Sequence, residues 1–259
     1  MKSRVIVVTG ASAGIGAALS ELGGKRDAKV VLVARREKEL ADVAARAGAE
    51  TLTVVADVTR RADVERARDA ALARFGQIDV WVNNAGRGIS RVVSELTDDD
   101  LDEMMTTNLK SALYGMQAVL PHFKERKRGH IVNVSSLLGR LPLAPFRSAY
   151  SASKHALNAL TANLRVELRD AFPDIHVSSV HPGVVSTEFG VKSLHGGVDS
   201  RALPGAQSAE EVAAVIADLI TKPAADVYTR PGAREMVAAY YGAEDMSVAE
   251  LGFGRIPSR

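Results

Sequence analysis

Tyr150 and Lys154 stand four residues apart in a stretch whose leucines recur at helical spacing, so both side chains lie on one face of a predicted helix. A free tyrosine has a pKa of about 10, whereas a group that gives and takes protons works best with a pKa close to the working pH. Lowering the pKa of Tyr150 to about 7 takes about 4 kcal/mol. One positive charge about 4 Å away supplies about that much at an effective dielectric constant of about 20. The pair could therefore pass a proton to a substrate oxygen, as the reduction of a carbonyl group requires.

Two further polar residues extend this candidate proton-transfer site. Ser136 follows an apolar run, and its hydroxyl could donate a hydrogen bond to the substrate oxygen as negative charge develops there. Asn108 places a poor helix former inside a helical stretch, so it is either tolerated there or has a polar function. A Tyr-x-x-x-Lys pair alone is usually part of an ordinary helix surface. The pattern therefore indicates a catalytic role only if a cofactor site lies beside these residues.

A glycine-rich turn follows the first apolar run. Gly10, Gly14 and Gly16 lie between that run and a stretch that can open a helix. Glycines let the backbone approach a pyrophosphate closely, and the unpaired N–H groups of a helix N-terminus favour its charge. The spacing is G-x-x-x-G-x-G, and three glycines could also form a plain structural turn. The position between strand and helix favours a dinucleotide site.

The end of the second apolar run bears on the choice of cofactor. An acidic residue there would accept hydrogen bonds from the adenosine ribose and indicate NAD. The chain instead has Ala34 followed by Arg35 and Arg36, and guanidinium groups are natural partners of a 2′-phosphate. The two arginines could also be solvated residues at the start of a helix. NADP(H) is therefore the preferred cofactor, and NAD(H) remains possible.

Seven short apolar runs alternate with longer amphipathic stretches. The runs are continuous rather than alternating, as expected for parallel strands buried on both faces. They are Val5–Val8, Val30–Val33, Thr51–Val55, Ile78–Val82, Ile131–Val134, His176–Val180 and, more weakly, Asp226–Thr229. This order predicts an α/β fold, a doubly wound Rossmann-type parallel sheet of about seven strands with helices on both faces.

The organisation of the chain predicts one domain. No Pro/Ser-rich linker, repeat or low-complexity segment divides the sequence, so residues 1–259 are expected to form a single dinucleotide-binding oxidoreductase domain. Residues 187–207 carry several glycines without a clear period. A loop of this length in a compact domain is usually functional or mobile, and we interpret it as a substrate lid.

Taken together, these motifs resemble the short-chain dehydrogenase/reductase family, in its standard-length, single-domain branch. The resemblance rests on segments in family order across residues 9–187: TGASAGIG (9–16), Asp57-Val58, NNAG (83–86), Asn108, IVNVSS (131–136), YSASK (150–154) and HPGVVST (181–187). The resemblance implies the strand order 3-2-1-4-5-6-7.

The same resemblance implies site residues. The catalytic set would be Ser136, Tyr150, Lys154 and Asn108, with Asn108 helping to hold a water that connects Lys154 to solvent. The cofactor contacts would comprise Gly10, Ser12, Gly14, Ile15, Gly16, Arg35, Arg36, Asp57, Val58, Asn84, Ala85, Gly86, Tyr150, Lys154, Pro182, Gly183, Val185 and Thr187. Within this set, the glycines of the turn would face the pyrophosphate, Arg35 the 2′-phosphate and Val185 the nicotinamide carboxamide.

Three features depart from the family pattern. The stretch from Gly139 to Tyr150 is one residue longer than usual, and we choose Ser136 over Ser135 because Ser136-x-x-Gly139 keeps the local pattern. The first helix would end in Gly23-Gly24, which is expected to loosen it. Ala13 is not basic, so one of two usual NADP markers is absent.

Composition excludes several other classes. The chain has 259 residues, 46% of them hydrophobic, and no cysteine, so disulfides and thiolate chemistry are excluded. The net charge of +2 and a single dense basic cluster without interleaved aromatics do not favour nucleic-acid binding. The apolar runs are too short to span a membrane, and the first run is too short for a signal-peptide core, so a cytoplasmic protein is expected. The histidines show no metal-ligand spacing on one helix, and no metal site is predicted.

The function predicted from the sequence is an NADP(H)-dependent oxidoreductase that interconverts a carbonyl and an alcohol on a small-molecule substrate. Two alternatives stay open: a 3-ketoacyl-carrier-type reductase and a non-catalytic NADP-binding regulator. A homodimer or homotetramer is implied by the family resemblance. The lid residues mix apolar side chains with Lys192, His195 and Arg201, which suggests a partly apolar substrate with a polar end.

Overall fold

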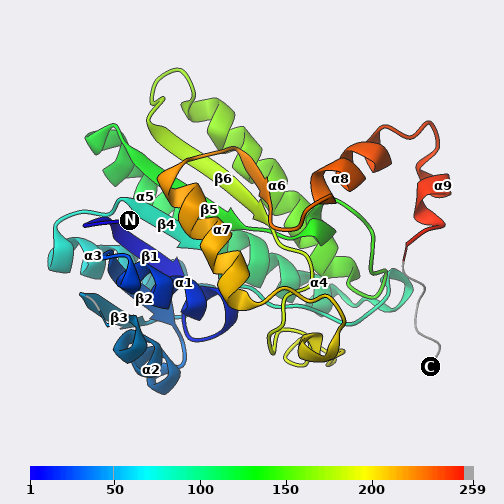
Figure 1. Ribbon diagram of the computed structural model, residues 1–259, viewed down its shortest axis with the longest axis horizontal. Coiled ribbons are helices and arrows are strands. Elements are labelled where there is room, and N and C mark those ends of the chain that lie inside the picture. Colours follow the sequence, from blue (N-terminus) through cyan, green and yellow to red (C-terminus); the bar gives the residue numbers. More distant parts are fainter. Residues whose placement is uncertain (49, 254–259) are drawn as a thin grey trace.

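A parallel sheet of seven strands forms the centre of the molecule (Figure 1). The computed structural model describes residues 1–48 and 50–253. The strands are β1 (Val5–Thr9), β2 (Lys29–Ala34), β3 (Thr51–Val55), β4 (Val80–Asn83), β5 (Gly129–Val134), β6 (Ile175–His181) and β7 (Asp226–Tyr228). Their order in the sheet is β3-β2-β1-β4-β5-β6-β7, which confirms the predicted doubly wound fold.

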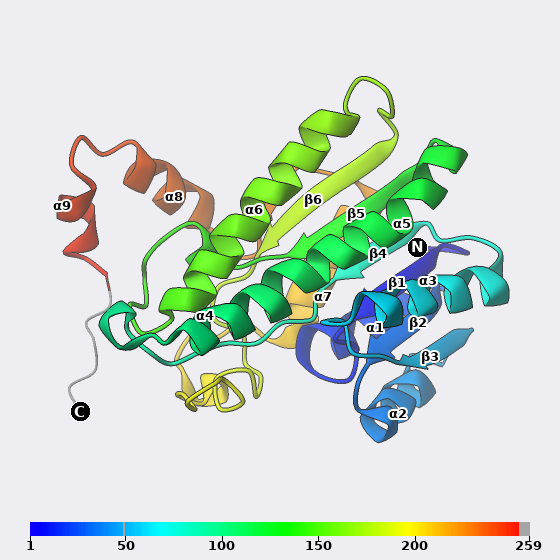
Figure 2. The same ribbon diagram turned by 180° about the vertical axis from the view of Figure 1, so that it is seen from behind.

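Helices cover both faces of this sheet. They are α1 (Gly14–Lys25), α2 (Glu37–Ala47), α3 (Arg61–Phe75), α4 (Asp98–Met105), α5 (Ser111–Arg126), α6 (Ser148–Leu168), α7 (Ala209–Thr221), α8 (Ala233–Tyr241) and α9 (Met246–Glu250). Helices α1, α2 and α7 lie on one face, and α3, α5 and α6 on the other, as the two opposite views show (Figures 1 and 2). A π-helical turn at Thr106–Lys110 joins α4 to α5, and short 3₁₀ turns occupy Val93–Glu95, Leu137–Gly139 and Ser200–Ala202.

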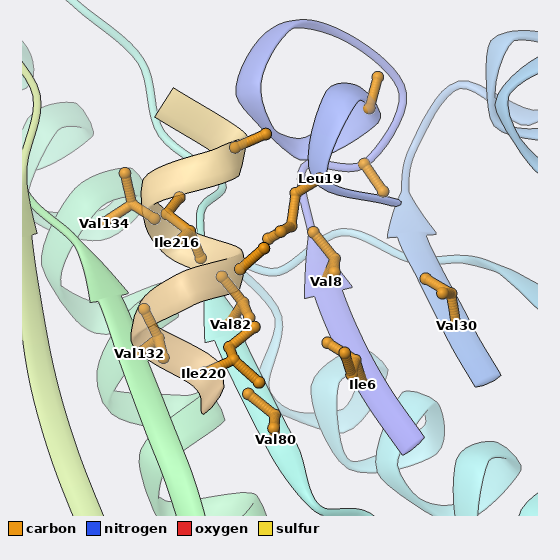
Figure 3. Packing of buried hydrophobic residues seen from close by; sticks show 14 of the residues in the cluster. Ile6, Val8, Leu19, Val30, Val80, Val82, Val132, Val134, Ile216 and Ile220 are labelled. Atoms are coloured by element: carbon orange, nitrogen blue, oxygen red, sulfur yellow. The ribbon is translucent and has the colours of Figure 1, made fainter. Parts of the chain in front are cut away.

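Successive residues of each central strand enter different hydrophobic cores. In β1, Ile6 and Val8 face the core under α1 and α7, whereas Val5 and Val7 face the core under α3 and α5. On the first side, Ile216 of α7 packs with apolar side chains of β4 and β5 (Figure 3). Burial on both faces explains why the strands read as continuous apolar runs.

One strand begins later than its apolar run predicts. The run starts at Ile78, but β4 starts at Val80. The backbone N–H of Ile78 donates to Nε2 of His122 at 3.1 Å, and its carbonyl accepts from Arg126 at 2.6 Å. Side chains of α5 therefore satisfy the backbone of Ile78 in place of a neighbouring strand.

The expected loosening at the end of the first helix is not found. Helix α1 continues through Gly23 and Gly24 to Lys25. A Cβ atom at Gly24 would lie 2.0 Å from the backbone oxygen of Ala47, the last residue of α2. Glycine here permits a close approach between the two helices, which offsets its low helix propensity.

This contact predicts that Gly24→Ala destabilises the protein, because the new methyl group meets a backbone carbonyl that cannot rotate away. We expect the free energy of unfolding to fall by about 1–3 kcal/mol, the usual cost of overpacking. Gly23→Ala is the matched control, since the nearest atoms to its Cβ all belong to side chains, the closest being a methyl of Val30 at 3.2 Å. Denaturant unfolding of both variants checks the prediction, and equal stabilities would contradict it.

Candidate active site

The carboxyl ends of the parallel strands form one edge of the sheet, and a cleft of about 1630 Å³ opens there. This exceeds the ~300–1,000 Å³ of ordinary small-molecule pockets, so the cleft has room for a dinucleotide and a second molecule. All of the site residues predicted from the sequence line it except Gly16 and Asn108. Those two lie behind the surface of the cleft and contact residues that line it. Gly16 lies against Gly10 and Asn84, and Asn108 is hydrogen-bonded to the backbone of Arg87.

The glycine-rich turn provides a backbone surface for an anion. Gly10 and Gly14 have φ angles of +67° and +54°, a conformation that side-chain-bearing residues rarely adopt. A Cβ at Gly16 would lie 2.4 Å from the Gly10 oxygen and 2.5 Å from Nδ2 of Asn84. The Ala13 N-cap of α1 offers no side-chain hydrogen bond, so the first N–H groups of the helix stay available to a ligand. These features fit a pyrophosphate.

The two arginines after β2 are placed differently. The guanidinium of Arg36 donates to Oγ of Ser12 at 3.0 Å and pairs with Glu39 at 3.1 Å, which fixes it against the glycine-rich turn. The side chain of Arg35 is 74% exposed, and its Nη1 lies 3.9 Å from the carboxylate of Asp57. Arg35 can therefore turn toward a ligand at little cost, whereas Arg36 is already positioned.

Ser136, Tyr150 and Lys154 meet at the inner end of the cleft, and all three are buried. Lys154 donates from Nζ to the carbonyl oxygen of Val134 at 2.8 Å, and its Nζ lies 5.7 Å from the centre of the Tyr150 ring. Ser136 is close enough to Tyr150 to lower the pKa of its hydroxyl, and the Ser136 hydroxyl accepts from the Leu138 N–H at 3.1 Å. The structure thus gathers the predicted proton-transfer residues in the segment after β5 and on α6.

The neighbouring serine points elsewhere. The hydroxyl of Ser135 donates to the backbone oxygen of Lys154 at 3.4 Å, and the residue is 4% exposed. Its side chain therefore faces the helix backbone and not the Tyr150 hydroxyl. This geometry favours the choice of Ser136 that the local sequence pattern suggested.

Burial controls the electrostatics of this cluster. It lowers the pKa of Lys154 to about 8 and raises the pKa of Tyr150 above its ordinary value. A hydrogen bond from Ser136 and the positive charge of Arg147 act against that rise at Tyr150. The sequence-based calculation, with Lys154 as the only charge, left out both the burial of the phenol and the charge of Arg147.

Asn108 lies in the π-helical turn and holds the loop after β4. Its Oδ1 accepts from the Arg87 N–H at 2.8 Å, and its Nδ2 donates to the Arg87 carbonyl at 3.0 Å and to Ser153 at 3.1 Å. The side chain therefore fixes this loop beside Gly86, where a Cβ would lie 2.9 Å from Oδ1 of Asn108. The water-holding role expected for Asn108 stays a prediction.

The loop after β6 closes the other side of the cleft. The carbonyl of Pro182 accepts from the Leu137 N–H at 2.8 Å, which ties this loop to the segment after β5. Val185 forms a β-bridge with Gln207. Thr187 lies over the glycine-rich turn, since a Cβ at Gly14 would be 3.3 Å from its methyl group. Residues 182–187 thus connect the two ends of the predicted cofactor site.

The segment 187–207 is docked on the body of the protein over this site. The ring of Phe189 packs edge-on against Tyr150 with centroids 5.5 Å apart. The backbone N–H of Leu194 donates to the Gly88 carbonyl at 2.8 Å, and His195 contacts Asp100 of α4 at 2.7 Å. The segment therefore forms part of the wall beside the reactive cluster.

Sequence reasoning missed Arg147 as a site residue. Arg147 lines the cleft, and its charge acts on Tyr150. The sequence did contain an indication of this role, because Arg147 precedes Tyr150 by three positions at the start of the predicted helix. Residues at that spacing lie near one another on one face. The contact between Phe189 of the predicted lid and Tyr150 was not foreseen from the sequence either.

Within residues 1–48 and 50–253, no group of three or more histidine, aspartate or glutamate side chains is placed to hold a metal ion. None of the helices described is both long and apolar enough to cross a bilayer.

Comparison with known proteins places the chain in a family. The family model described as short chain dehydrogenase matches residues 4–196. An uncharacterised oxidoreductase of Staphylococcus epidermidis is 36% identical over 187 residues, which cover 72% of this chain and 80% of the relative. The chain therefore belongs to the short-chain dehydrogenase/reductase family of oxidoreductases.

Solved structures agree with this assignment. A short chain dehydrogenase/reductase from Burkholderia phymatum, in complex with NAD, has a TM-score of 0.85 and 27% identity, and the match covers 100% of this chain and 98% of that chain. An alcohol dehydrogenase from the archaeon Thermococcus sibiricus, complexed with 5-hydroxy-NADP, has a TM-score of 0.77 and 28% identity, covering 88% of this chain and 96% of that one.

The burial of Lys154 predicts an amine that titrates far below an ordinary lysine. Its proton should leave as the pH rises through about 8, compared with 10.5 for the unperturbed group. Because the unfolded chain keeps that proton to higher pH, the free energy of unfolding should gain a contribution from this group as the pH rises between those values. Side-chain NMR titration of lysine amines checks this, with Lys154→Arg to assign the signal. A Lys154 midpoint above pH 10 would contradict it.

Proposed function

We propose that this protein is an NADP(H)-dependent oxidoreductase that interconverts a carbonyl and an alcohol. The observation that carries the proposal is the buried cluster of Ser136, Tyr150 and Lys154 at the inner end of a cleft large enough for a dinucleotide and a substrate. Solved relatives that hold NAD or an NADP derivative support a nicotinamide cofactor for this chain as well.

The roles follow from the contacts. Burial keeps the phenol of Tyr150 protonated at neutral pH, so its hydroxyl can give a proton to a carbonyl oxygen. The Leu138 N–H occupies an acceptor position of Ser136, which orients that hydroxyl to donate toward the same oxygen. Lys154, anchored on Val134, keeps positive charge beside the reacting groups below about pH 8. NADPH, when bound, supplies the hydride.

The remaining cofactor contacts are assigned by position. We propose that Gly10, Ser12, Gly14, Ile15 and Gly16 hold the pyrophosphate. The adenosine end would lie against Asp57, Val58, Asn84, Ala85 and Gly86, and the nicotinamide against Pro182, Gly183, Val185 and Thr187. Asn108 acts by holding the loop after β4 in place.

The wider organisation is part of the same proposal. The chain would act as one dinucleotide-binding domain, with residues 187–207 as the lid over Tyr150, and would assemble as a homodimer or homotetramer in the cytoplasm. The docking of Phe189 and Leu194 on the body supports a closed position of the lid.

The two alternatives are weaker. A 3-ketoacyl-carrier-type reductase would share the reactive cluster, but we expect a Gly-Gln-x-Asn run before the tyrosine of those enzymes. The approach to Tyr150 here is instead Pro145-Phe146-Arg147-Ser148-Ala149. A non-catalytic NADP-binding regulator would have no use for a buried lysine beside a buried phenol, since burying an amine is costly.

The two serines give a matched test of the reactive cluster. Ser136→Ala should lower kcat for NADPH-dependent carbonyl reduction by about 10²-fold or more, as loss of a donor to a developing oxyanion does. Ser135→Ala should have a much smaller effect, because its hydroxyl faces the Lys154 backbone. A panel of ketones and aldehydes with both variants measures this. The reverse ranking would assign the role to Ser135, and binding without turnover in the parent protein would favour the regulator.

The cofactor preference is tested at the end of β2. If Arg35 binds the 2′-phosphate, its charge-assisted hydrogen bonds should contribute about 1.5–3 kcal/mol, or about 10- to 150-fold in affinity. The double variant Ala34→Asp, Arg35→Ala should weaken NADPH binding and improve NADH binding. Arg35→Ala alone should change less, because Arg36 stays fixed beside Ser12. Calorimetric titration provides the measurement, and equal affinities of the parent for NADH and NADPH would refute the NADP assignment.

A further inference from the structure

The arginines of the cleft differ in whether a carboxylate compensates their charge. Seven arginines line it, and five of them pair with an acidic side chain: Arg35 with Asp57, Arg36 with Glu39, Arg46 with Glu21, Arg87 with Glu103 and Arg201 with Asp199. Within the described residues, Arg147 and Arg230 have no such partner. These two belong to the substrate end of the cleft, beside Tyr150 and Gly183.

Arg147 is a buried cation. Its residue exposure is 9%, and desolvation lowers its pKa from the ordinary value. Only Nη1 is bonded to the protein, at 3.0 Å to the Ile89 carbonyl and 2.6 Å to the Ser193 hydroxyl. A guanidinium has five N–H donors, so several remain for a ligand. Neither bonded group is anionic. The ring of Phe146, whose centre lies 5.5 Å from the guanidinium carbon, is a weak partner, and no carboxylate of the described residues pairs with the charge.

Arg230 is incompletely satisfied in the same way. Its Nη2 donates to the Gly205 carbonyl, while its Nε is buried without a hydrogen-bond partner. The side chain lies against Gly183, where a Cβ would be 2.6 Å from Cδ of Arg230. It therefore reaches the nicotinamide end of the predicted cofactor site from the end of β7, whereas Arg147 reaches it from the start of α6.

A buried charge is costly unless a partner of opposite sign meets it. The protein supplies that partner for each of the five other arginines of the cleft, so the partner of these two is expected to arrive with a ligand. A carboxylate suits this role, because its two oxygens match the planar fork of a guanidinium.

We propose that the substrate is a carbonyl or alcohol compound that also carries a carboxylate, which Arg147 binds with the help of Arg230. This inference rests on the proposed oxidoreductase function. Arg147 is the N-cap of α6, three residues before Tyr150, and both side chains line the cleft. The carboxylate would therefore lie only a few bonds from the carbonyl that Tyr150 protonates. Phe189 and Leu143 add an apolar wall for the body of the molecule.

The test compares keto acids with their methyl esters. The acids place one to four carbons between carbonyl and carboxylate, and kcat/KM with NADPH is measured for each acid and ester. The parent protein should prefer the best acid over its ester by about 10- to 100-fold, as expected for a hydrogen-bonded charge pair. The readout is the ratio of kcat/KM for acid and ester, because any effect of the lost charge on Tyr150 changes both compounds alike. Arg147→Met should remove most of this preference, Arg230→Met should reduce it, and Arg147→Lys should keep part of it.

Two control variants separate recognition of the charge from other effects. Arg87→Met removes a cleft arginine that Glu103 already compensates, so the preference for the acid should stay. Ser193→Ala removes the bond between Arg147 and the lid but leaves the cation, so the preference should also stay. A preference lost equally in Ser193→Ala would mean that Arg147 only anchors the lid, and would overturn the proposal.

A binding measurement keeps the proposal separate from the proposed function. Calorimetric titration of the same keto acids into the protein with NADP⁺ should show binding in the parent and at least a tenfold loss in Arg147→Met. Absence of turnover with any compound would refute the oxidoreductase assignment while this titration still reports on the carboxylate site. The inference would be overturned if the parent had equal kcat/KM for acid and ester. It would also be overturned if Arg147→Met and Arg230→Met both kept the preference of the parent for the acid. If Arg147→Met does not fold, the same comparison of acid and ester is made with Arg147→Lys and Arg230→Met, and a preference unchanged in both would overturn the inference.

Discussion

The hydrogen bond from Nζ of Lys154 to the carbonyl oxygen of Val134 is the contact on which the reactive site depends. It joins α6 to the last residue of β5 in a place where the amine is cut off from water. A buried amine needs an acceptor, and the carbonyl at the end of the strand supplies one. Because the helix is fixed in this way, Tyr150 one turn earlier must face Ser136, which follows the same strand.

The rest of the fold supports that contact from both sides. Residues of β5 alternate between the two hydrophobic cores, so the strand cannot shift without exposing apolar side chains to water. Asn108 ties the loop after β4 to Ser153 of α6, beside Lys154. The glycine-rich turn is held against the end of β4 by Asn84, whose side chain donates to the Thr9 carbonyl at 2.9 Å. The cofactor end and the reactive end of the cleft therefore share one rigid support.

The sequence was sufficient for features that depend on local pattern. Continuous apolar runs predicted the strands, the glycine spacing predicted the turn after β1, and the Tyr150–Lys154 spacing placed both side chains on one helix face. Contacts between segments that are distant in the sequence could not be predicted from local pattern. The start of β4 depends on His122 and Arg126 of α5, and Gly24 is required by the backbone of α2. The raised pKa of Tyr150 is the result of burial by residues such as Phe189 that lie far away in the chain.

The proposed function requires Tyr150 to give the proton when the carbonyl is reduced, and the variant Tyr150→Phe removes that proton. Phenylalanine keeps the ring and its packing against Phe189 but has no proton to transfer. Single-turnover reduction of a substrate of the parent protein, followed by NADPH absorbance, should be slower by about 10²- to 10⁴-fold, the usual contribution of general acid catalysis. The affinity for NADPH, measured by titration, should be nearly unchanged. A single-turnover rate within about tenfold of the parent would contradict the account, because another group would then supply the proton.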